Sequence, residues 1–280
     1  MINFNGKLHA NAAILSLENR GYKYGDALFE TIKVINGKPL FWEDHYFRLM
    51  ASMRIMRMEI PMGFTMEFLE SEILKTLEAN SLDQKIARVR ITVDRGEGGN
   101  YLPISKQINF SISSSLLNES KYVINEVIKC EVDLFKDFFI NEGLLSNLKT
   151  NNKITNILGS IYAQENDLDN CLLLNNSKNV VECLNGNIFL VHGNIIKTPP
   201  LTDGCLKGIM RQQLIGLLNK NEKFTLDESS ISTFELQKAD ELFYTNVIKG
   251  IVPITHYRKK TYKTQIAQEL LGNLNTKIGT

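Results

Sequence analysis

Three residues whose side chains could do chemistry together lie in the second half of the chain. Lys149 lies in SNLKTNNKITNILGSIYAQEN (146–166), where a polar stretch gives way to a helical pattern. Glu182 lies between apolar residues in VVECLNGNIF, and Gly208 opens a second helical pattern in LKGIMRQQLI. An amine, a carboxylate and a helix start that binds an anion are the groups a protein needs to hold and use pyridoxal phosphate.

Each group has its own part in that chemistry. The Lys149 amine would form the Schiff base and, once released, would carry a proton. Glu182 would be costly among apolar neighbours without a partner, and the protonated pyridine nitrogen would supply one. The free N–H groups of the first helical turn after Gly208 would bind the phosphate. Each residue also has an ordinary interpretation: a solvated lysine, a strand-end glutamate and a plain helix start.

Composition narrows the class of protein. The chain has 280 residues, 43% hydrophobic and 22% charged, a length that fits two globular lobes. A net charge of +1 and a pI of about 7.6 show no excess of basic residues of the kind that binds nucleic acid. No apolar run approaches the roughly 18 residues of a membrane span, and the N-terminal sequence lacks the features of a signal peptide. We therefore expect a cytoplasmic protein without nucleic-acid or membrane partners.

Cysteine and histidine usage gives no sign of a metal site. The four cysteines have neither CxxC pairing nor zinc-ligand spacing, which indicates buried thiols in a reducing compartment. The histidines are scattered along the chain. The sequence positions are Cys130, Cys171, Cys183 and Cys205, and His9, His45, His192 and His256.

Hydrophobic periodicity indicates strands mixed with helices, without a regular βαβ rhythm. Asn5-Gly6 and Asn36-Gly37 lie between apolar runs and predict two β-hairpins. Strict alternation over 86–94 predicts a half-buried strand, with 108–115 as its partner. Amphipathic helices are predicted over 43–56, 65–78, 150–166, 208–218 and 263–275, and further strands over 122–133, 171–176, 179–184, 187–192, 195–198 and 241–247.

These elements predict an α+β protein with two lobes. SSSLLNESKY (113–122) has the low apolar density of a linker. We place an N-terminal α/β lobe at 1–117, the linker at 118–122 and a C-terminal lobe that carries Lys149 at 123–280. In the helix over 150–166 we expect Ile154, Ile157, Leu158 and Ile161 to face inward.

Seven motifs, in order and spacing, make the chain resemble the class IV aminotransferases, the fold-type IV pyridoxal-phosphate enzymes. The likeness is strongest to 4-amino-4-deoxychorismate lyases and extends to branched-chain and D-amino-acid aminotransferases. It implies the two-domain D-amino-acid aminotransferase-like fold, a homodimer and a cofactor cleft between lobes. The motifs are RGYKYGDALFETIKV, EDHYFRLMAS, VDRGEGGNYLP, LKTNNKITNILG, VVECLNGNIF, TPPLTDGCLKGIMR and ADELFYTNVIKGIVPI.

The resemblance also implies roles for single residues. Lys149 matches the Schiff-base lysine, and Glu182 matches the carboxylate at the pyridine nitrogen. Arg48 matches the arginine that contacts the phosphate. The remaining cofactor contacts are Gly208, Ile209 and Met210 at the helix start and Asn246 and Val247 in the late loop. Glu30 lies in the motif at the face of the cofactor, and Tyr24, Phe29, Arg95 and Tyr101 are candidates for contact with a small amino-carboxylate substrate.

Details of the motifs favour a lyase, which would expel pyruvate and leave 4-aminobenzoate for folate synthesis. TNVIKGIVPI resembles the lyase pattern, and Val247 stands where aminotransferases tend to carry a threonine. GIMR and the glycine-rich RGEGGNY also match lyases better. Ala27 and Asn100 depart from the lyase pattern, and Asn100 bears on recognition of the substrate carboxylate. An aminotransferase of branched-chain or D-amino acids and an inactive cofactor-binding paralogue remain the alternatives.

Overall fold

The computed structural model describes residues 1–10, 14–119, 121–124 and 129–279. The chain divides into two compact units. Unit 1 comprises Met1–Ser120 together with the short segment Lys149–Asn152, and unit 2 comprises Lys121–Leu148 and Lys153–Thr280. The chain therefore leaves unit 2 for four residues, and the first of these is Lys149.

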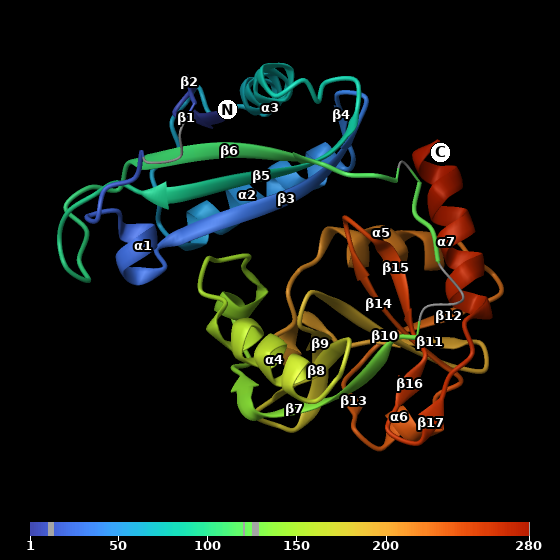
Figure 1. Cartoon of the computed structure of the whole chain (residues 1–280). Helices are drawn as coiled ribbons and strands as arrows, with labels where there is room; N and C mark the ends of the chain where they lie inside the picture. Colours follow the sequence, from blue (N-terminus) through green and yellow to red (C-terminus); the bar gives the residue numbers. More distant parts are fainter. Residues whose placement is uncertain (11–13, 120, 125–128, 280) are drawn as a thin grey trace. The chain divides into compact units, whose positions relative to one another are not determined.

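Unit 1 is built on a six-stranded antiparallel sheet in the order β2-β1-β6-β5-β3-β4. The long strands β6, β5 and β3 lie side by side (Figure 1). The strand bounds are β1 Ile2–Phe4, β2 Lys7–His9, β3 Ala27–Ile35, β4 Lys38–Pro39, β5 Ile86–Arg95 and β6 Ile108–Leu116.

Local sequence explains the turns and helices of unit 1. Asn5-Gly6 and Asn36-Gly37 both have positive φ at both positions, as a type I′ hairpin turn requires, so both predicted hairpins are confirmed. Helix α3 (Met66–Ala79) begins after Thr65, whose hydroxyl accepts a hydrogen bond from the Phe68 N–H. The other helices are α1 (Arg20–Tyr24) and α2 (Trp42–Ile55).

Unit 2 contains an 11-stranded sheet whose main path runs β12-β11-β10-β9-β8-β7-β16-β17. Strand β10 also pairs with β14, and β14 with β15, so β10 is a branch point of the sheet. The strand bounds are β7 Glu131–Ile140, β8 Asn170–Asn175, β9 Asn179–Cys183, β10 Gly186–His192, β11 Ile195–Thr198, β12 Thr225–Glu228, β13 Ile231–Ser232, β14 Glu241–Asn246, β15 Gly250–Ile254, β16 His256–Tyr257 and β17 Lys260–Thr261.

The helices of unit 2 pack against this sheet, with α5 and α7 also in contact with each other. They are α4 (Ile154–Glu165), α5 (Ile209–Leu218), α6 (Glu235–Lys238) and α7 (Gln265–Ile278), with short 3-10 turns at Leu144–Asn147 and Leu201–Asp203. No helix in the described ranges is long and apolar enough to cross a membrane.

The prediction that the isoleucines of α4 face inward is wrong. Ile154, Ile157 and Ile161 are 58%, 53% and 46% exposed. The small residues Gly159 and Ala163 are buried instead, because Gly159 lets the helix approach the Leu184 side chain closely. Apolar periodicity identified the helix but not the face that packs on its own sheet.

The predicted strand over 108–115 is confirmed, since β6 pairs with β5 as far as Leu116. One prediction needs correction at the start of unit 2. The predicted strand over 122–133 begins only at Glu131. Residues 122–124 are irregular, and 125–128 lie outside the described residues. The Tyr122 N–H and carbonyl hydrogen-bond to the Asn275 side chain instead of to a strand.

Candidate active site

Lys149 is held by backbone hydrogen bonds to the edge of β3 in unit 1. The Phe29 N–H donates to the Lys149 carbonyl at 2.9 Å, and the Asn151 N–H donates to the Ala27 carbonyl at 2.9 Å. Between them, Thr150 forms an antiparallel bridge with Leu28. The Lys149 side chain therefore leaves from a backbone fixed in register with the strand.

The Phe29 ring lies close to two cations. The Lys149 Nζ atom is 4.5 Å from the ring centroid, and the Arg90 Cζ atom is 3.7 Å from it. Arg90 also donates to the side chains of Thr92 (3.2 Å) and Asn151 (3.1 Å). Cation–π contacts of this kind fix the position of a guanidinium without using up its donors. Phe29 therefore brings the candidate nucleophile and a second cation together.

Arg48 is positioned by a buried ion pair with Glu30. The Arg48 Nε atom donates to Glu30 Oε1 at 2.8 Å, and Nη2 donates to Oε2 at 2.5 Å. His45 Nδ1 lies 2.7 Å from the same Oε2 atom. Burial alone raises the pKa of Glu30, but the charge of Arg48 and the hydrogen bond with His45 outweigh it and bring that pKa to about 2. Glu30 is therefore ionised at neutral pH and orients the guanidinium.

His45 stays neutral in this cluster. Burial lowers its pKa, Glu30 opposes that effect, and the positive charges of Arg48 and Lys149 lower the pKa further. A neutral imidazole has one N–H, which the adjacent carboxylate places on Nδ1. Nε2 is then an acceptor, and it is buried without a hydrogen-bond partner in the described chain.

In unit 2, Glu182 is the first of a row of polar residues that crosses three strands. Glu182 on β9 pairs in register with Asn187 on β10, which in turn pairs with Thr245 on β14. Directly paired residues of antiparallel strands point to the same face of a sheet. The Leu206 N–H donates to Glu182 Oε2 at 2.9 Å, and Asn187 Nδ2 donates to the Leu206 carbonyl at 2.8 Å. The backbone of Leu206 therefore connects the side chains of Glu182 and Asn187 to the loop before α5.

The start of α5 has the form of an anion site. Gly208 is its N-cap and offers no side-chain cap. The N–H groups of Ile209 and Met210 donate to no residue that the structure describes, although both residues are buried. A Cβ atom at Gly208 would lie 1.9 Å from Asn187 Oδ1, so no other residue fits there without movement. A buried, uncapped helix start needs a ligand or water to satisfy it.

The loop between β14 and β15 is a tight turn organised by Asn246. Its Oδ1 atom accepts from the N–H groups of Ile248 (3.1 Å) and Lys249 (2.9 Å), and its Nδ2 atom donates to the Asn185 carbonyl at 3.2 Å. The Val247 carbonyl accepts from the Tyr122 hydroxyl at 2.8 Å. The asparagine thus forms an Asx turn, which fixes the backbone on either side of Val247.

These observations fit pyridoxal phosphate. Unit 2 offers a carboxylate that accepts a backbone N–H, a helix start that nothing in the described chain caps, and a buried Thr245 hydroxyl oxygen without a partner among the described residues. Unit 1 offers an amine and an oriented guanidinium. Each group has the donor or acceptor character that one part of the cofactor requires.

Two of the candidates for substrate contact, Arg95 and Tyr101, lie in surroundings that do not indicate a binding role. Arg95 donates from all three nitrogens within unit 1, to Asp26 (2.9 Å) and to the carbonyls of Arg57 (3.1 Å) and Met56 (2.6 Å). Its guanidinium therefore braces the sheet, which does not favour direct contact with substrate. Tyr101 is 90% exposed, with its ring 5.9 Å from that of Tyr24.

Arg20 holds the glycine-rich loop that carries Tyr101. This buried guanidinium donates to the carbonyls of Gly98 (3.0 Å), Gly99 (3.3 Å), Asn100 (2.6 Å) and Tyr101 (3.3 Å). Like Arg95, it also pairs with Asp26. Sequence reasoning identified the loop but not the arginine that holds it, because a single arginine at the first position of a short helix carries no local signal.

Arg90 and Asn187 are site residues that the sequence interpretation missed. For Arg90 part of the signal existed: alternation over β5 places it with Arg88 and Thr92 on the face opposite the core residues. Its closeness to Lys149 depends on the pairing of distant segments, which alternation does not report. For Asn187 no signal existed, since its role depends on strand register. The described residues contain no group of histidine, cysteine or acidic side chains arranged to hold a metal.

Comparison with known proteins agrees with this geometry. The family model for class IV amino-transferases matches residues 27–257. A putative branched-chain-amino-acid aminotransferase of Methanocaldococcus jannaschii is 30% identical over 99% of this chain and 94% of its own length. A D-alanine aminotransferase of Listeria monocytogenes is 26% identical over 87% of this chain and 82% of its own length.

A solved structure extends the agreement to three dimensions. The crystal structure of 4-amino-4-deoxychorismate lyase from Pseudomonas aeruginosa superposes with a TM-score of 0.84, at 25% identity, over 99% of this chain and 98% of that one. This chain therefore has the two-domain, fold-type IV α+β fold. The chain therefore belongs to the class IV aminotransferase family and is a pyridoxal-phosphate-dependent enzyme, either a lyase or an aminotransferase.

Proposed function

We propose that the protein is a 4-amino-4-deoxychorismate lyase, which eliminates pyruvate and releases 4-aminobenzoate for folate synthesis. The observation that carries this proposal is the loop after β14. Asn246 organises its turn through two backbone N–H groups, and Val247 has no hydroxyl to offer a phosphate. This is the lyase pattern of the loop, and the likeness to the Pseudomonas aeruginosa enzyme over nearly the full length of both chains supports it.

The residues of the chain divide the work in this proposal. When bound, pyridoxal phosphate supplies a ring that withdraws the electron pair left at the amine-bearing carbon. The Lys149 amine takes the proton from that carbon. Glu182 would keep the pyridine nitrogen protonated, and the N–H groups of Ile209 and Met210 would hold the phosphate. Arg48 is the candidate for a further phosphate contact.

Arg90 is the residue to which we assign a substrate carboxylate. Its guanidinium is fixed over Phe29, on which Lys149 also packs, and it bonds only to neutral side chains in the described chain. A guanidinium without a paired carboxylate favours an anionic ligand. In the elimination, the ring of the substrate loses the proton of the amine-bearing carbon, and the bond between the neighbouring ring carbon and the ether oxygen breaks. The enolpyruvate that leaves with this oxygen takes up a proton at its methylene carbon and becomes pyruvate.

The test is a direct assay of both candidate reactions, elimination and amine transfer. The purified enzyme with pyridoxal phosphate is incubated with 4-amino-4-deoxychorismate, and 4-aminobenzoate and pyruvate are measured together. We expect equal amounts of the two products. Amine transfer from leucine, glutamate or D-alanine to a 2-oxo acid, without 4-aminobenzoate, would contradict the lyase. Absence of every activity in a protein that retains the cofactor would indicate the inactive paralogue.

An aminotransferase is the second candidate function. It is favoured by the 30% identity to a putative branched-chain-amino-acid aminotransferase over 99% of the chain. The same lysine would then return its proton to the cofactor side of the amine, and water would release a keto acid. In that case Arg90 would bind the carboxylate of the amino acid.

We also propose that the protein acts as a homodimer in the cytoplasm. The exposed isoleucines Ile154, Ile157 and Ile161 recur at helical spacing along α4, and an exposed apolar stripe is a feature of protein interfaces. The four free, buried cysteines suit a reducing compartment. Light scattering on the native protein and on Ile157→Glu tests the first part: we expect a dimer and a monomer. A native monomer would contradict it.

A further inference from the structure

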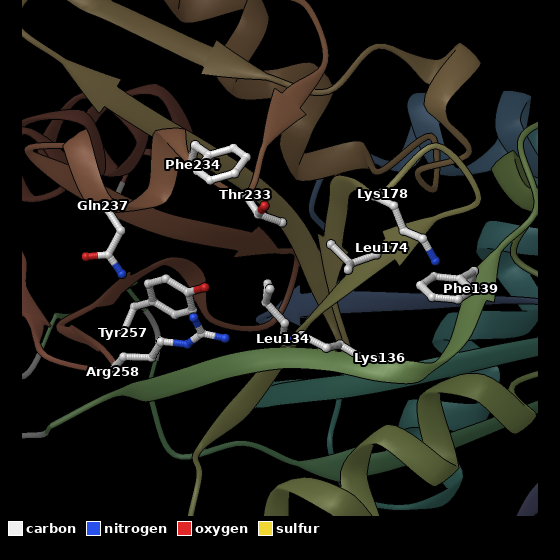
Figure 2. A pocket seen from close by; sticks show the side chains of 10 residues that line it. All are labelled: Leu134, Lys136, Phe139, Leu174, Lys178, Thr233, Phe234, Gln237, Tyr257 and Arg258. Carbon is white, nitrogen blue, oxygen red and sulfur yellow. The ribbon is translucent and has the colours of Figure 1, made fainter.

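Unit 2 contains a cavity of about 490 Å³ whose lining includes no residue of the candidate active site. Figure 2 shows the side chains around it, which come from β7, β8, the turn before β9, the segment at α6 and β16. The volume lies within the range of pockets that bind small molecules. No residue that lines this cavity has a role in the proposed lyase or aminotransferase reaction.

The floor of the cavity is apolar and its rim is aromatic. Leu134, Leu174 and Tyr257 are buried in the core of unit 2. Phe139 is partly buried, and Phe234 is 81% exposed at the opposite part of the rim. A large phenylalanine that contacts little of its own protein is costly to leave in water. A flat apolar ligand would bury it.

Three cations line the same cavity and no carboxylate does. The Lys178 Nζ atom lies 3.3 Å from the centroid of the Phe139 ring. Neither Lys136 nor Lys178 forms an ion pair with any residue in the described ranges. Arg258 donates from Nε to Asp133 at 3.1 Å, and its two Nη groups donate to no described residue. The lining therefore carries three positive charges, of which Arg258 alone is paired with an acidic side chain.

Tyr257 adds a neutral donor beside Arg258. Its ring is buried, and its hydroxyl has no hydrogen-bond partner among the residues that the structure describes. The Arg258 Cζ atom lies 5.1 Å from the centroid of this ring, and both groups lie beside Leu134 in Figure 2. Burial raises the pKa of Tyr257, so the hydroxyl stays protonated at neutral pH. A guanidinium fork and an adjacent O–H are suited to an anionic group.

We propose that this cavity is a second binding site, which takes an aromatic ring that bears a carboxylate or a phosphate. The ring lies between Phe139 and Phe234 over the apolar floor, and the anionic group reaches Arg258 and Tyr257. The positive charges of Lys136 and Lys178 favour the same sign of ligand. This inference does not depend on which reaction the enzyme catalyses.

The experiment is calorimetric titration of the holoenzyme with four probes: benzoate, phenyl phosphate, benzamide and acetate. We expect saturable binding of benzoate or phenyl phosphate, and binding at least about tenfold weaker for benzamide, which lacks the charge, and for acetate, which lacks the ring. The arm that binds more tightly identifies the anionic group. Equal binding of benzamide, or no binding of either aromatic anion, would overturn the proposal.

Variants locate the site and separate it from the active site. Lys178→Gln and Phe234→Ala change exposed side chains, and each should weaken the aromatic anion about tenfold or more. Tyr257→Phe keeps the ring and removes the hydroxyl, and should weaken binding several-fold. Lys238→Gln and Phe138→Ala are matched controls, exposed on α6 and β7 outside the cavity, and should change nothing. Binding that survives Phe234→Ala and Lys178→Gln but is lost in Gly208→Ala would place the anion at the active site and contradict the inference.

Discussion

The Arg48 guanidinium and the Glu30 carboxylate form a bidentate pair, with hydrogen bonds of 2.8 and 2.5 Å. Glu30 is 2% exposed, and His45 holds its second side. A long arginine side chain on a helix would otherwise sample many rotamers. The pair fixes the direction of the guanidinium, and in our proposal Glu30 is therefore a positioning residue for Arg48.

Glu30→Gln should destabilise the protein and weaken retention of the cofactor together. The variant leaves Arg48 buried without its counter-charge, a change that typically costs about 3–5 kcal/mol. Urea unfolding measures the first effect, and equilibrium dialysis of pyridoxal phosphate measures the second. Glu70→Gln, at an exposed position of α3, is the control and should match the native protein. Full retention of the cofactor in a destabilised Glu30→Gln would show that the pair is structural only.

The same carboxylate gives unit 1 a defined acid sensitivity. The pKa of Glu30 is about 2, against an ordinary value of 4.5. Because the folded-state pKa is depressed, its stabilisation is complete above about pH 4.5 and is lost as the pH falls from there toward 2. The difference in unfolding free energy between the native protein and Glu30→Gln should therefore shrink by about 1.4 kcal/mol per pH unit in this window. A difference that stays constant between pH 5 and pH 3 would contradict the assignment.

Local sequence patterns predicted the elements that depend on turn-forming residues or on the alternation of apolar and polar residues. The Asn-Gly pairs predicted both hairpins of unit 1, and alternation predicted the pairing of β5 with β6. The same patterns predicted no relation between distant segments. That Lys149 bonds to the edge of β3 depends on the path of the chain between the units, and no local signal reports it.

The sequence pattern also failed to predict which apolar residues of α4 are buried. The isoleucines of α4 form as good an apolar stripe as a core helix has, yet they are exposed. Periodicity shows that a helix has an apolar face and leaves open what covers that face. The polar row of Glu182, Asn187 and Thr245 was hidden for a related reason, because it exists only through the register of three strands.

Gly208→Ala should impair binding of the cofactor, since the added Cβ atom would lie 1.9 Å from Asn187 Oδ1. Either Asn187 or the start of α5 must move, and both border the anion site. We expect the dissociation constant for pyridoxal phosphate to rise about tenfold or more. Gly216→Ala on the same helix meets no atom within 4 Å and should be neutral or stabilising. Equal affinities in the two variants would exclude the phosphate site at this helix.

Glu182→Gln should lower turnover far more than retention of the cofactor. The amide keeps an oxygen for the Leu206 N–H, which donates at 2.9 Å in the native protein, but it loses the charge that, in our proposal, keeps the pyridine nitrogen protonated. We expect turnover to fall roughly 10²-fold with little change in the dissociation constant. Single-turnover kinetics under saturating cofactor test this directly, and an unchanged rate would refute the role of the carboxylate.

The central claim is that the Lys149 amine forms a covalent bond with pyridoxal phosphate. Borohydride reduction of the holoenzyme, followed by proteolysis and mass spectrometry, locates that bond. We predict a pyridoxyl phosphate adduct on the peptide that contains Lys149, retained in the control Lys85→Arg and absent in Lys149→Ala together with all turnover. An adduct on another lysine, or none in a protein that contains the cofactor, would contradict the account.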